Sequence, residues 1–391
     1  MSKTKLFDAV VIGGGLVGTA CAVALAQQGF KLALIESAQP MGMPADNDWD
    51  SRIYAISPGN AAWLEGLGVW SALDQSRITS IVKMLVYGDD GESRLEFNAY
   101  EANAACLGHI VESRLLQHGL WAPLSQSSVE VQTGVQCKSI DWQHDLALIQ
   151  LDDGQSISSK LVIAADGANS WVRGQTDIAL QGHDYGQMGV VANFETTLSH
   201  QCIARQWFRE DGVMAWLPLA GNRISMVWST HQVHAEALLN LSPQALSDCV
   251  AEAGQHVLGE LRLITPAAAF PLSLQSVHTV LKPRLVLIGD AAHVIHPLAG
   301  QGVNLGFRDV EALAKILEQR STYQDIGDAM LLRRYERCRK ADIMAMQHAT
   351  DGLQKLFANP QPLVKKLRNW GLRLTDSQAT LKKRLMAQAM I

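Results

Sequence analysis

A glycine-rich segment near the N-terminus constrains the fold of this chain more than any other feature. Residues 9–12 form an apolar, β-branched run that is typical of a strand buried on both faces of a sheet. Residues 13–18 then have the spacing G-x-G-x-x-G, residues 19–28 favour a helix, and residues 31–35 favour a second strand. This order predicts a strand–turn–helix–strand unit that begins a parallel sheet.

Each glycine of this turn has a physical role in a phosphate-binding loop. Gly13 permits the tight turn, Gly15 lets backbone amides approach a pyrophosphate, and Gly18 lets the helix pack closely against the strand. Gly14 lies in the same loop and is assigned to the same site. Glu36, 18 residues after Gly18, is placed to accept hydrogen bonds from an adenosine ribose and to repel a 2′-phosphate. The segment therefore predicts a dinucleotide site that disfavours NADP, and it leaves FAD and NAD open.

The same run also has the look of a signal peptide or a short membrane span. Residues 9–26 hold only apolar residues, glycines and one threonine. Asp8 interrupts the basic start, however, and the spacing of the clustered glycines is better explained by nucleotide binding.

A length of 391 residues predicts two domains. A hydrophobic content of 48%, a charged content of 18% and a net charge of -5 exclude a disordered chain and argue against nucleic-acid binding.

Two later segments also place a turn directly after a strand. Residues 160–164 form an apolar run that leads to Asp166-Gly167 and then to a helix start over 171–173. Residues 284–288 form another apolar run, which ends in Gly289-Asp290. A glycine-rich loop over 297–306 follows and predicts the start of a further helix.

With these three motifs the chain resembles the single-component flavoprotein aromatic hydroxylases, which share the fold of para-hydroxybenzoate hydroxylase. That family has an N-terminal G-x-G-x-x-G, a central D-G and a C-terminal G-D, in the order found here. The resemblance implies an α/β fold class: a Rossmann-like FAD-binding domain with a parallel sheet, a substrate domain with a mostly antiparallel sheet, and a C-terminal helical tail. The implied boundaries are 1–79, 100–178 and 276–330 for the FAD-binding domain, 80–99 and 179–275 for the substrate domain, and 331–391 for the tail.

The resemblance also implies roles for individual residues. Asp290 would accept a hydrogen bond from a ribityl hydroxyl of FAD, and the amides of residues 300–304 would stabilise negative charge on reduced flavin. Asp166 and Gly167 would lie near both FAD and the reductant. The cofactor-binding residues are then Gly13, Gly14, Gly15, Gly18, Glu36, Arg52, Arg114, Gln117, Asp166, Gly167, Gly289, Asp290, Pro297, Gly300, Gln301, Gly302, Val303 and Asn304.

Three segments are similar to the ubiquinone-biosynthesis hydroxylases in particular. They are SRIYAIS at 51–57, LGHIVE at 107–112 and PLAGQGVNLG at 297–306. Arg52 matches an arginine that family members place near the flavin, and Arg114 and Gln117 match a further helix that contacts FAD. One departure is Gly212-Val213, where members often have Gly-Pro, and this difference puts the shape of the substrate-side turn in doubt.

The implied reaction is hydroxylation of the aromatic ring of a polyprenylated phenol or benzoquinol, through a hydroperoxide formed on the reduced flavin. O2 would be the co-substrate, and NAD(P)H would bind transiently as reductant, since the chain has one dinucleotide fingerprint. No side chain identifies itself as a catalytic acid or base, because the chemistry is centred on the flavin. An apolar substrate pocket is predicted, with ordinary core packing as the alternative for each of its residues, Trp207, Phe208, Met214 and Trp216.

The C-terminal residues 361–391 combine seven Lys or Arg with one acidic residue, so the preceding chain is acidic. Leucines and a tryptophan recur there at helical spacing, at positions 363, 367, 370 and 374. The pattern predicts an amphipathic helix that binds an anionic membrane or a biosynthetic complex, with packing on its own domain as the alternative. The expected location is cytoplasmic, at the inner face of the cell membrane, and the pattern leaves a homo-oligomer open.

Other classes of site and function receive less support. Six dispersed cysteines exclude a disulfide scaffold and a zinc ribbon and favour buried thiols, and His293 and His296 lack further ligands, so no metal is expected. Hydroxylation of a small soluble aromatic acid remains open, as does an inactive flavoprotein-like scaffold. A flavin reductase also remains open, whereas a halogenase is disfavoured because the chain lacks a W-x-W-x-I-P motif.

Overall fold

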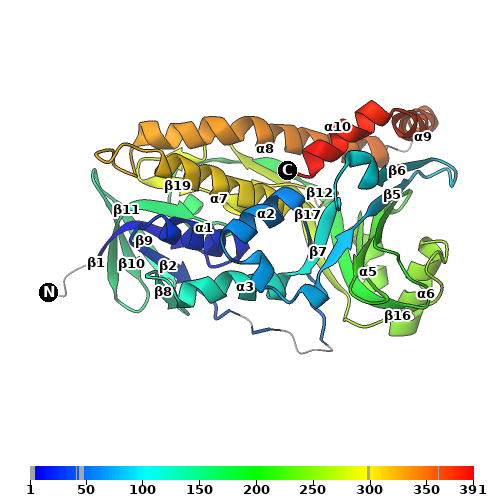
Figure 1. Ribbon diagram of the computed structural model, residues 1–391, viewed down its shortest axis with the longest axis horizontal. Helices are drawn as coiled ribbons and strands as arrows, with labels where there is room; N and C mark the ends of the chain where they lie inside the picture. The colour runs from blue at the N-terminus through cyan, green and yellow to red at the C-terminus, as the bar shows by residue number, and fades with distance from the viewer. Residues whose placement is uncertain (1–4, 41, 44–47, 297–299, 360) are drawn as a thin grey trace.

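Two large sheets, joined by a small third one, organise the computed structural model, which describes residues 5–40, 42–43, 48–296, 300–359 and 361–391. In Figure 1 the first sheet lies at the left and the second at the right, and the long helix α8 (Ala329–Ala358) runs along the top from one toward the other. The predicted fold class is confirmed: a mixed α/β chain with a parallel sheet, a mostly antiparallel sheet and C-terminal helices.

The first sheet is built on the N-terminal unit. Its central strands are parallel, in the order β19-β11-β1-β2-β8, with β18, β9 and β10 added by antiparallel pairing. The apolar runs 9–12 of β1 and 161–164 of β11 are fully buried, which fits strands covered on both faces. The strands are β1 (Lys5–Ile12), β2 (Leu32–Glu36), β8 (Glu130–Thr133), β9 (Cys137–Trp142), β10 (Ala147–Leu151), β11 (Ser156–Ala164), β18 (Leu281–Lys282) and β19 (Leu285–Leu287).

Helices cover this sheet and share one core with it. Helix α1 follows the glycine turn and packs against α3 and α7, and α7 packs in turn against α8. The helices around this sheet are α1 (Leu16–Gln27), α2 (Pro58–Gly66), α3 (Ser113–Ser125), α4 (Trp171–Gly174) and α7 (Gly302–Glu318).

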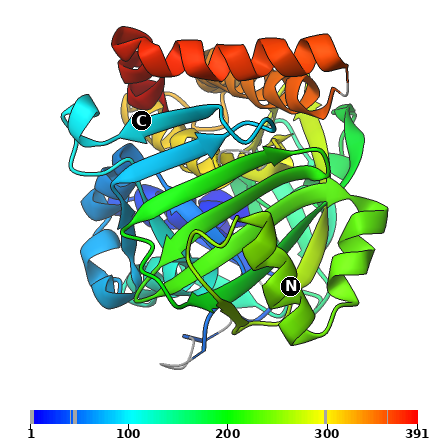
Figure 2. The same ribbon diagram turned by 90° about the vertical axis from the view of Figure 1, so that its right-hand side faces the viewer.

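The second sheet is mostly antiparallel, as its short alternating runs predict. The hairpin of β5 and β6 joins it through a parallel pairing of β5 with β13. Helices α5 (Gln232–Leu239) and α6 (Pro243–Ala253) cover its outer face (Figure 2). The strands are β5 (Lys83–Tyr87), β6 (Arg94–Asn98), β12 (Leu180–Thr196), β13 (Ile203–Arg209), β14 (Gly212–Leu219), β15 (Arg223–His231), β16 (Leu261–Leu263), β17 (Ala268–Val277) and β20 (His293–Val294).

A three-stranded sheet lies where the two large sheets meet. It consists of β3 (Ile53–Ile56), β4 (Thr79–Ile81) and β7 (Gly108–Glu112), paired in the order β3-β7-β4. A small apolar core joins it to the inner face of the second sheet, with Ile81 and Ile110 packing near Ala204 and Leu219. The small sheet thereby fixes the second large sheet relative to the glycine-rich loop over 297–306, called the flavin loop below, because Gly300 of that loop lies beside Ala55 of β3.

The C-terminal helices pack on the β5–β6 hairpin through their polar residues. Arg368 and Asn369 of α9 (Pro362–Ser377) are buried and both bond Asp89, while Arg373 pairs with Asp90. In α10 (Ala379–Ala389), Lys382 pairs with Glu101 and Asp376. Three basic residues of the segment 361–391 therefore pair with acidic residues much earlier in the chain, and two of them, Arg368 and Lys382, are buried in these pairs.

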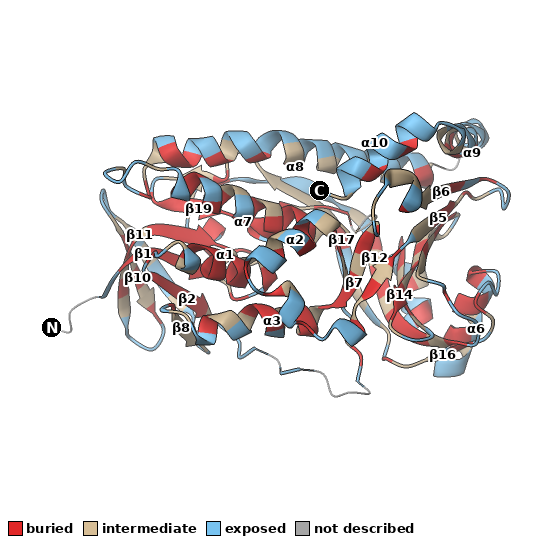
Figure 3. Cartoon of the chain, in the orientation of Figure 1, coloured by how far each residue is buried: buried red, intermediate tan, exposed pale blue. Residues whose placement is uncertain are grey.

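The predicted apolar stripe of α9 consequently faces outward (Figure 3). Leu363 is 70% exposed, Trp370 61%, Leu367 54% and Leu374 43%. Within the described part of the chain, every helix is too short or too polar to traverse a bilayer. All six cysteines are free. The expectation of buried thiols holds for Cys21 and Cys106, whereas Cys137, Cys202 and Cys249 are partly buried and Cys338 is exposed.

Candidate active site

The N-terminal glycine turn has the close contacts that its sequence predicts. Gly13 has a φ of +106°, and a side chain there would collide with the carbonyl of Ala165 at the end of β11. A side chain at Gly18 would collide with the carbonyl of Gly13. At Gly15, by contrast, no described atom lies within 4 Å of an added Cβ, so the loop backbone there is open to a ligand. Both features suit a phosphate held against the start of α1.

Several polar side chains converge on Gly14 in the same loop. The Glu36 carboxylate accepts the Gly14 amide hydrogen at 2.5 Å. The Gly14 carbonyl accepts hydrogen bonds from Gln117 Nε2 at 2.5 Å, Thr19 Oγ1 at 2.9 Å and Trp121 Nε1 at 3.2 Å. The structure thus brings the predicted residues Glu36 and Gln117 together at the glycine turn, although they come from different elements.

The central motif carries an acceptor without a partner. Asp166 follows β11, and its Oδ2 accepts the amide hydrogen of Val172 at 3.0 Å. Its Oδ1 is buried and has no hydrogen-bond partner within the described residues. Gly167, with a φ of +83°, has open space around its Cβ position. A buried oxygen without a partner is costly, so this carboxylate fits a site that a ligand hydroxyl completes.

Asp290 of the C-terminal motif has an exposed side chain. Desolvation by the surrounding protein nevertheless raises the pKa of its carboxyl, and His293 and Arg52 oppose that shift. Gly289 has a φ of +58° and packs on Val17 of α1. The exposed carboxylate is available to a hydroxyl-rich ligand, as the resemblance implies for a ribityl chain.

A buried cluster of charged residues holds the Gly289-Asp290 turn in place. Asp309 of α7 is fully buried and accepts hydrogen bonds from His293 Nε2 at 2.6 Å, Arg339 Nε at 2.7 Å and the Gly289 amide at 2.9 Å. Burial would raise the pKa of Asp309, but His293 and Arg339 outweigh burial and hold it below its ordinary value. Asp309 thereby fixes the turn that presents Asp290. Sequence analysis did not identify Asp309 as a functional residue. The signal that could have found it is a carboxylate on the apolar face of α7.

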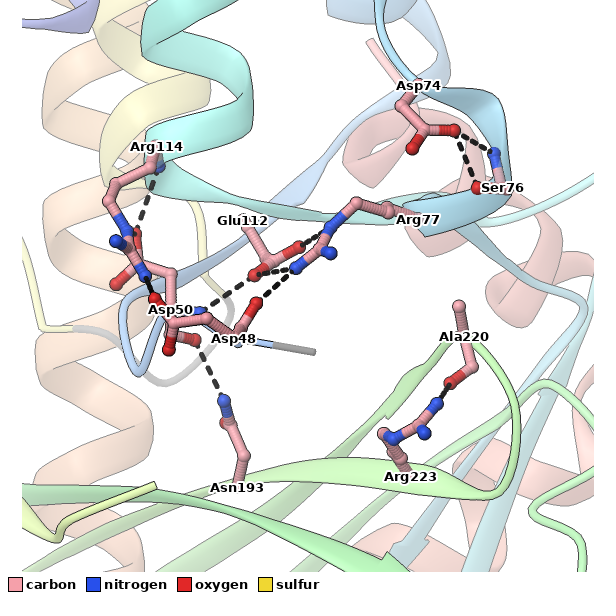
Figure 4. A network of polar contacts seen from close by, with 10 residues as sticks. All are labelled: Asp48, Asp50, Asp74, Ser76, Arg77, Glu112, Arg114, Asn193, Ala220 and Arg223. Carbon is pink, nitrogen blue, oxygen red and sulfur yellow. Dashed lines mark hydrogen bonds and ion pairs between the residues drawn. The ribbon is translucent and has the colours of Figure 1, made fainter. Parts of the chain in front are cut away.

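A second network holds the segment that precedes Arg52 (Figure 4). Asp50 accepts the amide hydrogens of Arg52 and Arg114, each at 3.0 Å. Its own amide donates to buried Glu112, and its carbonyl accepts Asn193 Nδ2 of the second sheet at 2.8 Å. The Arg114 side chain pairs with Asp48 at 2.9 Å. The Arg52 side chain is exposed, and its guanidinium lies 5.6 Å from the ring of Tyr54. Asp50 thus ties the segment before β3 to the small sheet, to α3 and to the second large sheet.

The flavin loop ends in the first turn of α7. Pro297 lies outside the described residues. Gly300 has a φ of +60° and lies beside Ala55 of β3, and space is open around Gly302. Gln301 and Val303 flank that glycine at the start of the helix. The Asn304 side chain is buried and bonds the backbone of Ser57 and Ala55, so it fastens α7 to β3 and α2.

The predicted pocket residues lie elsewhere. Trp207, Met214 and Trp216 are buried in a core with α5 and α6, on the outer face of the second sheet. Side chains alternate between the two faces of a strand. Ala204 of β13 and Leu217 of β14 therefore lie on the opposite, inner face, where they pack against the small sheet. Phe208 stacks on Phe357 of α8. The structure therefore favours the core alternative for the first three, and the pocket residues remain a prediction.

Comparison with known proteins identifies the family. A family model described as an FAD binding domain matches residues 7–350. The chain belongs to this FAD-binding family. It is 35% identical to the 3-demethoxyubiquinol 3-hydroxylase of Escherichia coli K12, over 98% of each chain. It is also 32% identical to the human mitochondrial ubiquinone biosynthesis monooxygenase COQ6, over 99% of this chain and 93% of that protein.

Solved structures of other proteins show the same fold. The p-nitrophenol 4-monooxygenase PnpA of Pseudomonas putida DLL-E4 aligns with a TM-score of 0.79 at 18% identity, covering 99% of both chains. Klebsiella pneumoniae HpxO, in a complex with FAD and uric acid, aligns with a TM-score of 0.77 at 18% identity, covering 99% of this chain and 98% of HpxO. FAD is accordingly the cofactor of this chain, and the open glycine loops and the buried Asp166 oxygen fit it.

Replacing Asp290 with alanine is expected to weaken FAD binding about tenfold, because a charge-assisted hydrogen bond contributes about 1.5–3 kcal/mol. Titration of the apoprotein with FAD, followed by flavin fluorescence, measures the change. Asp153→Ala, in the exposed turn between β10 and β11, is the matched control and should bind as the wild type does. Equal affinity of the Asp290 and Asp153 variants would show that the carboxylate does not contact the cofactor.

Proposed function

We propose that the chain is an FAD-dependent monooxygenase that hydroxylates the aromatic ring of a polyprenylated phenol or benzoquinol in ubiquinone biosynthesis. The observation that carries this proposal is near full-length similarity to enzymes named for that pathway, together with the convergence of three flavin motifs. O2 is the co-substrate and NAD(P)H the reductant. Bound FAD supplies the redox chemistry: it takes up electrons and delivers one oxygen atom of O2 to the ring.

The residues of the chain bind and orient the flavin. The open backbone at Gly15 and the ribose acceptor Glu36 hold the adenosine diphosphate half. Asp290 and Asp166 accept hydrogen bonds from the ribityl side. The first turn of α7 would present its amides to the flavin ring, where a helix N-terminus stabilises negative charge. The second sheet would cover the ring and exclude water from it.

Expression of this chain in a bacterial strain that lacks its own demethoxyubiquinol hydroxylase tests the proposal. Restored ubiquinone and loss of the accumulated precursor are expected. A precursor that persists, although flavin-loaded protein is present in the cells, would contradict the proposal. Turnover of small soluble phenolic acids by the purified protein in that case would favour a catabolic hydroxylase instead.

We also propose that α9 attaches the protein to an anionic membrane surface. The support is the outward apolar stripe of Leu363, Leu367, Trp370 and Leu374. Lys366 of α9 is exposed, and so are Lys383 and Arg384 of α10. None of these three side chains forms an ion pair with a described residue. Leucine and tryptophan flanked by lysine are typical of helices that lie in the membrane interface. A polyprenylated substrate resides in such a membrane.

The double substitution Leu367→Glu with Trp370→Glu is expected to weaken vesicle binding at least about tenfold. Each of these side chains would otherwise contribute roughly 1.5–3 kcal/mol on burial in lipid. Co-sedimentation with vesicles of phosphatidylglycerol and phosphatidylcholine measures the change. Val233→Glu, on the exposed face of α5, is the control. Undiminished sedimentation of the double variant would refute the proposed attachment, and association with a protein partner would be the alternative.

A further inference from the structure

His296 is buried and has no hydrogen-bond partner among the residues that the structure describes. The residue is 1% exposed, and neither Nδ1 nor Nε2 bonds any described group. Buried polar side chains are nearly always hydrogen-bonded, and one that is not calls for a specific reason. His293, three residues earlier, shows the usual arrangement, since its Nε2 bonds Asp309. The hydrogen-bonding capacity of His296 is therefore unused within the described chain.

The position of His296 links the flavin loop to the second sheet. It lies two residues after the end of β20, which pairs with β17 at Gln275 and Ser276. Four residues later Gly300 lies against Ala55 of β3, the strand that begins beside Arg52. His296 therefore lies in the stretch of chain between the second sheet and Gly300, which packs on the small sheet.

The surroundings of the imidazole hold it rigidly. The ring of Tyr185 on β12 meets it edge-to-face, with centroids 4.9 Å apart. The Tyr185 hydroxyl donates to Asp351 of α8 at 3.2 Å, and Lys355 and His183 also pair with that carboxylate, at 2.6 and 3.5 Å. Asp351 is thus occupied by three other groups and orients Tyr185 rather than bonding the imidazole.

The ring is neutral at physiological pH. Burial lowers the pKa of His296 to about 4, and Asp351 opposes the shift only in part. A neutral imidazole has one nitrogen that donates and one that accepts. A ligand with a hydroxyl group could satisfy the accepting nitrogen without bringing a charge into a buried site.

We propose that His296 accepts a hydrogen bond from the ring hydroxyl of the aromatic substrate and thereby sets which ring carbon faces the flavin. This inference rests on the proposed function, because it assigns the substrate a phenolic oxygen. A hydrogen bond accepted from that hydroxyl also increases electron density in the ring, which favours attack by an electrophilic oxygen. His296 is then a catalytic residue that the flavin-binding motifs do not include.

The substitutions His296→Leu and His296→Gln test the proposal on the holoenzyme. The probe is a short-chain 3-demethoxyubiquinol analogue, and its binding is followed by the change in flavin absorbance. His296→Leu is expected to keep its bound FAD, to bind the probe about tenfold more weakly, and to release hydrogen peroxide in place of hydroxylated product. His296→Gln, which keeps a donor and an acceptor, should recover part of both properties.

His234→Leu is the matched control. That imidazole also meets an aromatic ring edge-on, that of Trp228, but it lies on α5 and bonds Thr230. Its variant should bind and hydroxylate the probe as the wild type does. The inference would be overturned if the His296→Leu variant bound the probe and formed product as the wild type does. It would also be overturned if this variant lost FAD in proportion to its loss of product.

The same experiment separates the two proposals. If the wild type binds the probe through His296 but forms no hydroxylated product, the proposed function fails and the binding role stands. If the wild type hydroxylates the probe and His296→Leu does so equally, the binding role fails alone. If the wild type does not bind the probe, both fail.

Discussion

Replacing Gly18 with alanine is expected to lower FAD affinity about 10- to 100-fold. The added Cβ would strike the Gly13 carbonyl and approach the side chain of Ala165, so α1 would move away from β1. Overpacking of this kind costs about 1–3 kcal/mol, and the strain falls on the loop that holds the pyrophosphate. FAD content of the purified protein and titration of the apoprotein measure the loss.

Gly66→Ala provides the control for this prediction. Gly66 lies at the end of α2, and no described atom is within 4 Å of its added Cβ. This variant should keep its flavin and melt at or slightly above the wild-type temperature. A Gly18→Ala protein that folds and binds FAD with wild-type affinity would show that close packing of α1 on β1 is not required.

Replacing Asp309 with alanine is expected to destabilise the protein by about 3–5 kcal/mol. The substitution leaves the buried Arg339 guanidinium, His293 and the Gly289 amide without their shared acceptor. Thermal unfolding of the apoprotein measures the change without the contribution of bound FAD. Asp342→Ala removes a half-exposed partner of the same Arg339 and should cost about 1 kcal/mol or less. Equal melting temperatures of the two variants would contradict the account.

The same carboxylate predicts a dependence of stability on pH. Because the pKa of Asp309 is lower in the folded chain than in the unfolded chain, the unfolded chain takes up the proton first as pH falls. The stabilisation is complete above the ordinary aspartate pKa, near pH 4, and is lost as pH falls toward the folded value. Wild-type protein should therefore lose stability below about pH 4 more steeply than Asp309→Ala. Parallel pH profiles would indicate that other carboxylates dominate.

The flavin motifs were predictable because they are local. Gly13, Gly18 and Glu36 lie within one strand–turn–helix–strand unit, where spacing alone determines which residues meet. The contacts that brace the site were not predictable in this way. Asp309 meets Arg339 on another helix, and the Asp50 carbonyl in the loop before β3 meets Asn193 of the second sheet, so only tertiary packing reveals these pairs.

The failures of sequence reasoning have equally specific causes. Alternation identified two faces of β13 and β14, but not which face points toward the flavin loop, and Trp207 and Trp216 lie on the outer one. The sequence predicted a basic face beside an apolar stripe in the C-terminal segment, but not which of its basic residues are paired within the molecule. In the structure, Arg368 and Lys382 are buried against acidic residues of the β5–β6 region, so the apolar stripe of α9 is what remains exposed.

Single turnover with isotopically labelled O2 tests the central claim most directly. The purified holoenzyme is reduced, mixed with the short-chain 3-demethoxyubiquinol analogue and exposed to labelled O2. The mass of the product is then measured by mass spectrometry. The account predicts that the aromatic ring gains one labelled oxygen atom for each reduced flavin. Oxygen that derives from water, or an unchanged ring despite reoxidation of the flavin, would contradict it.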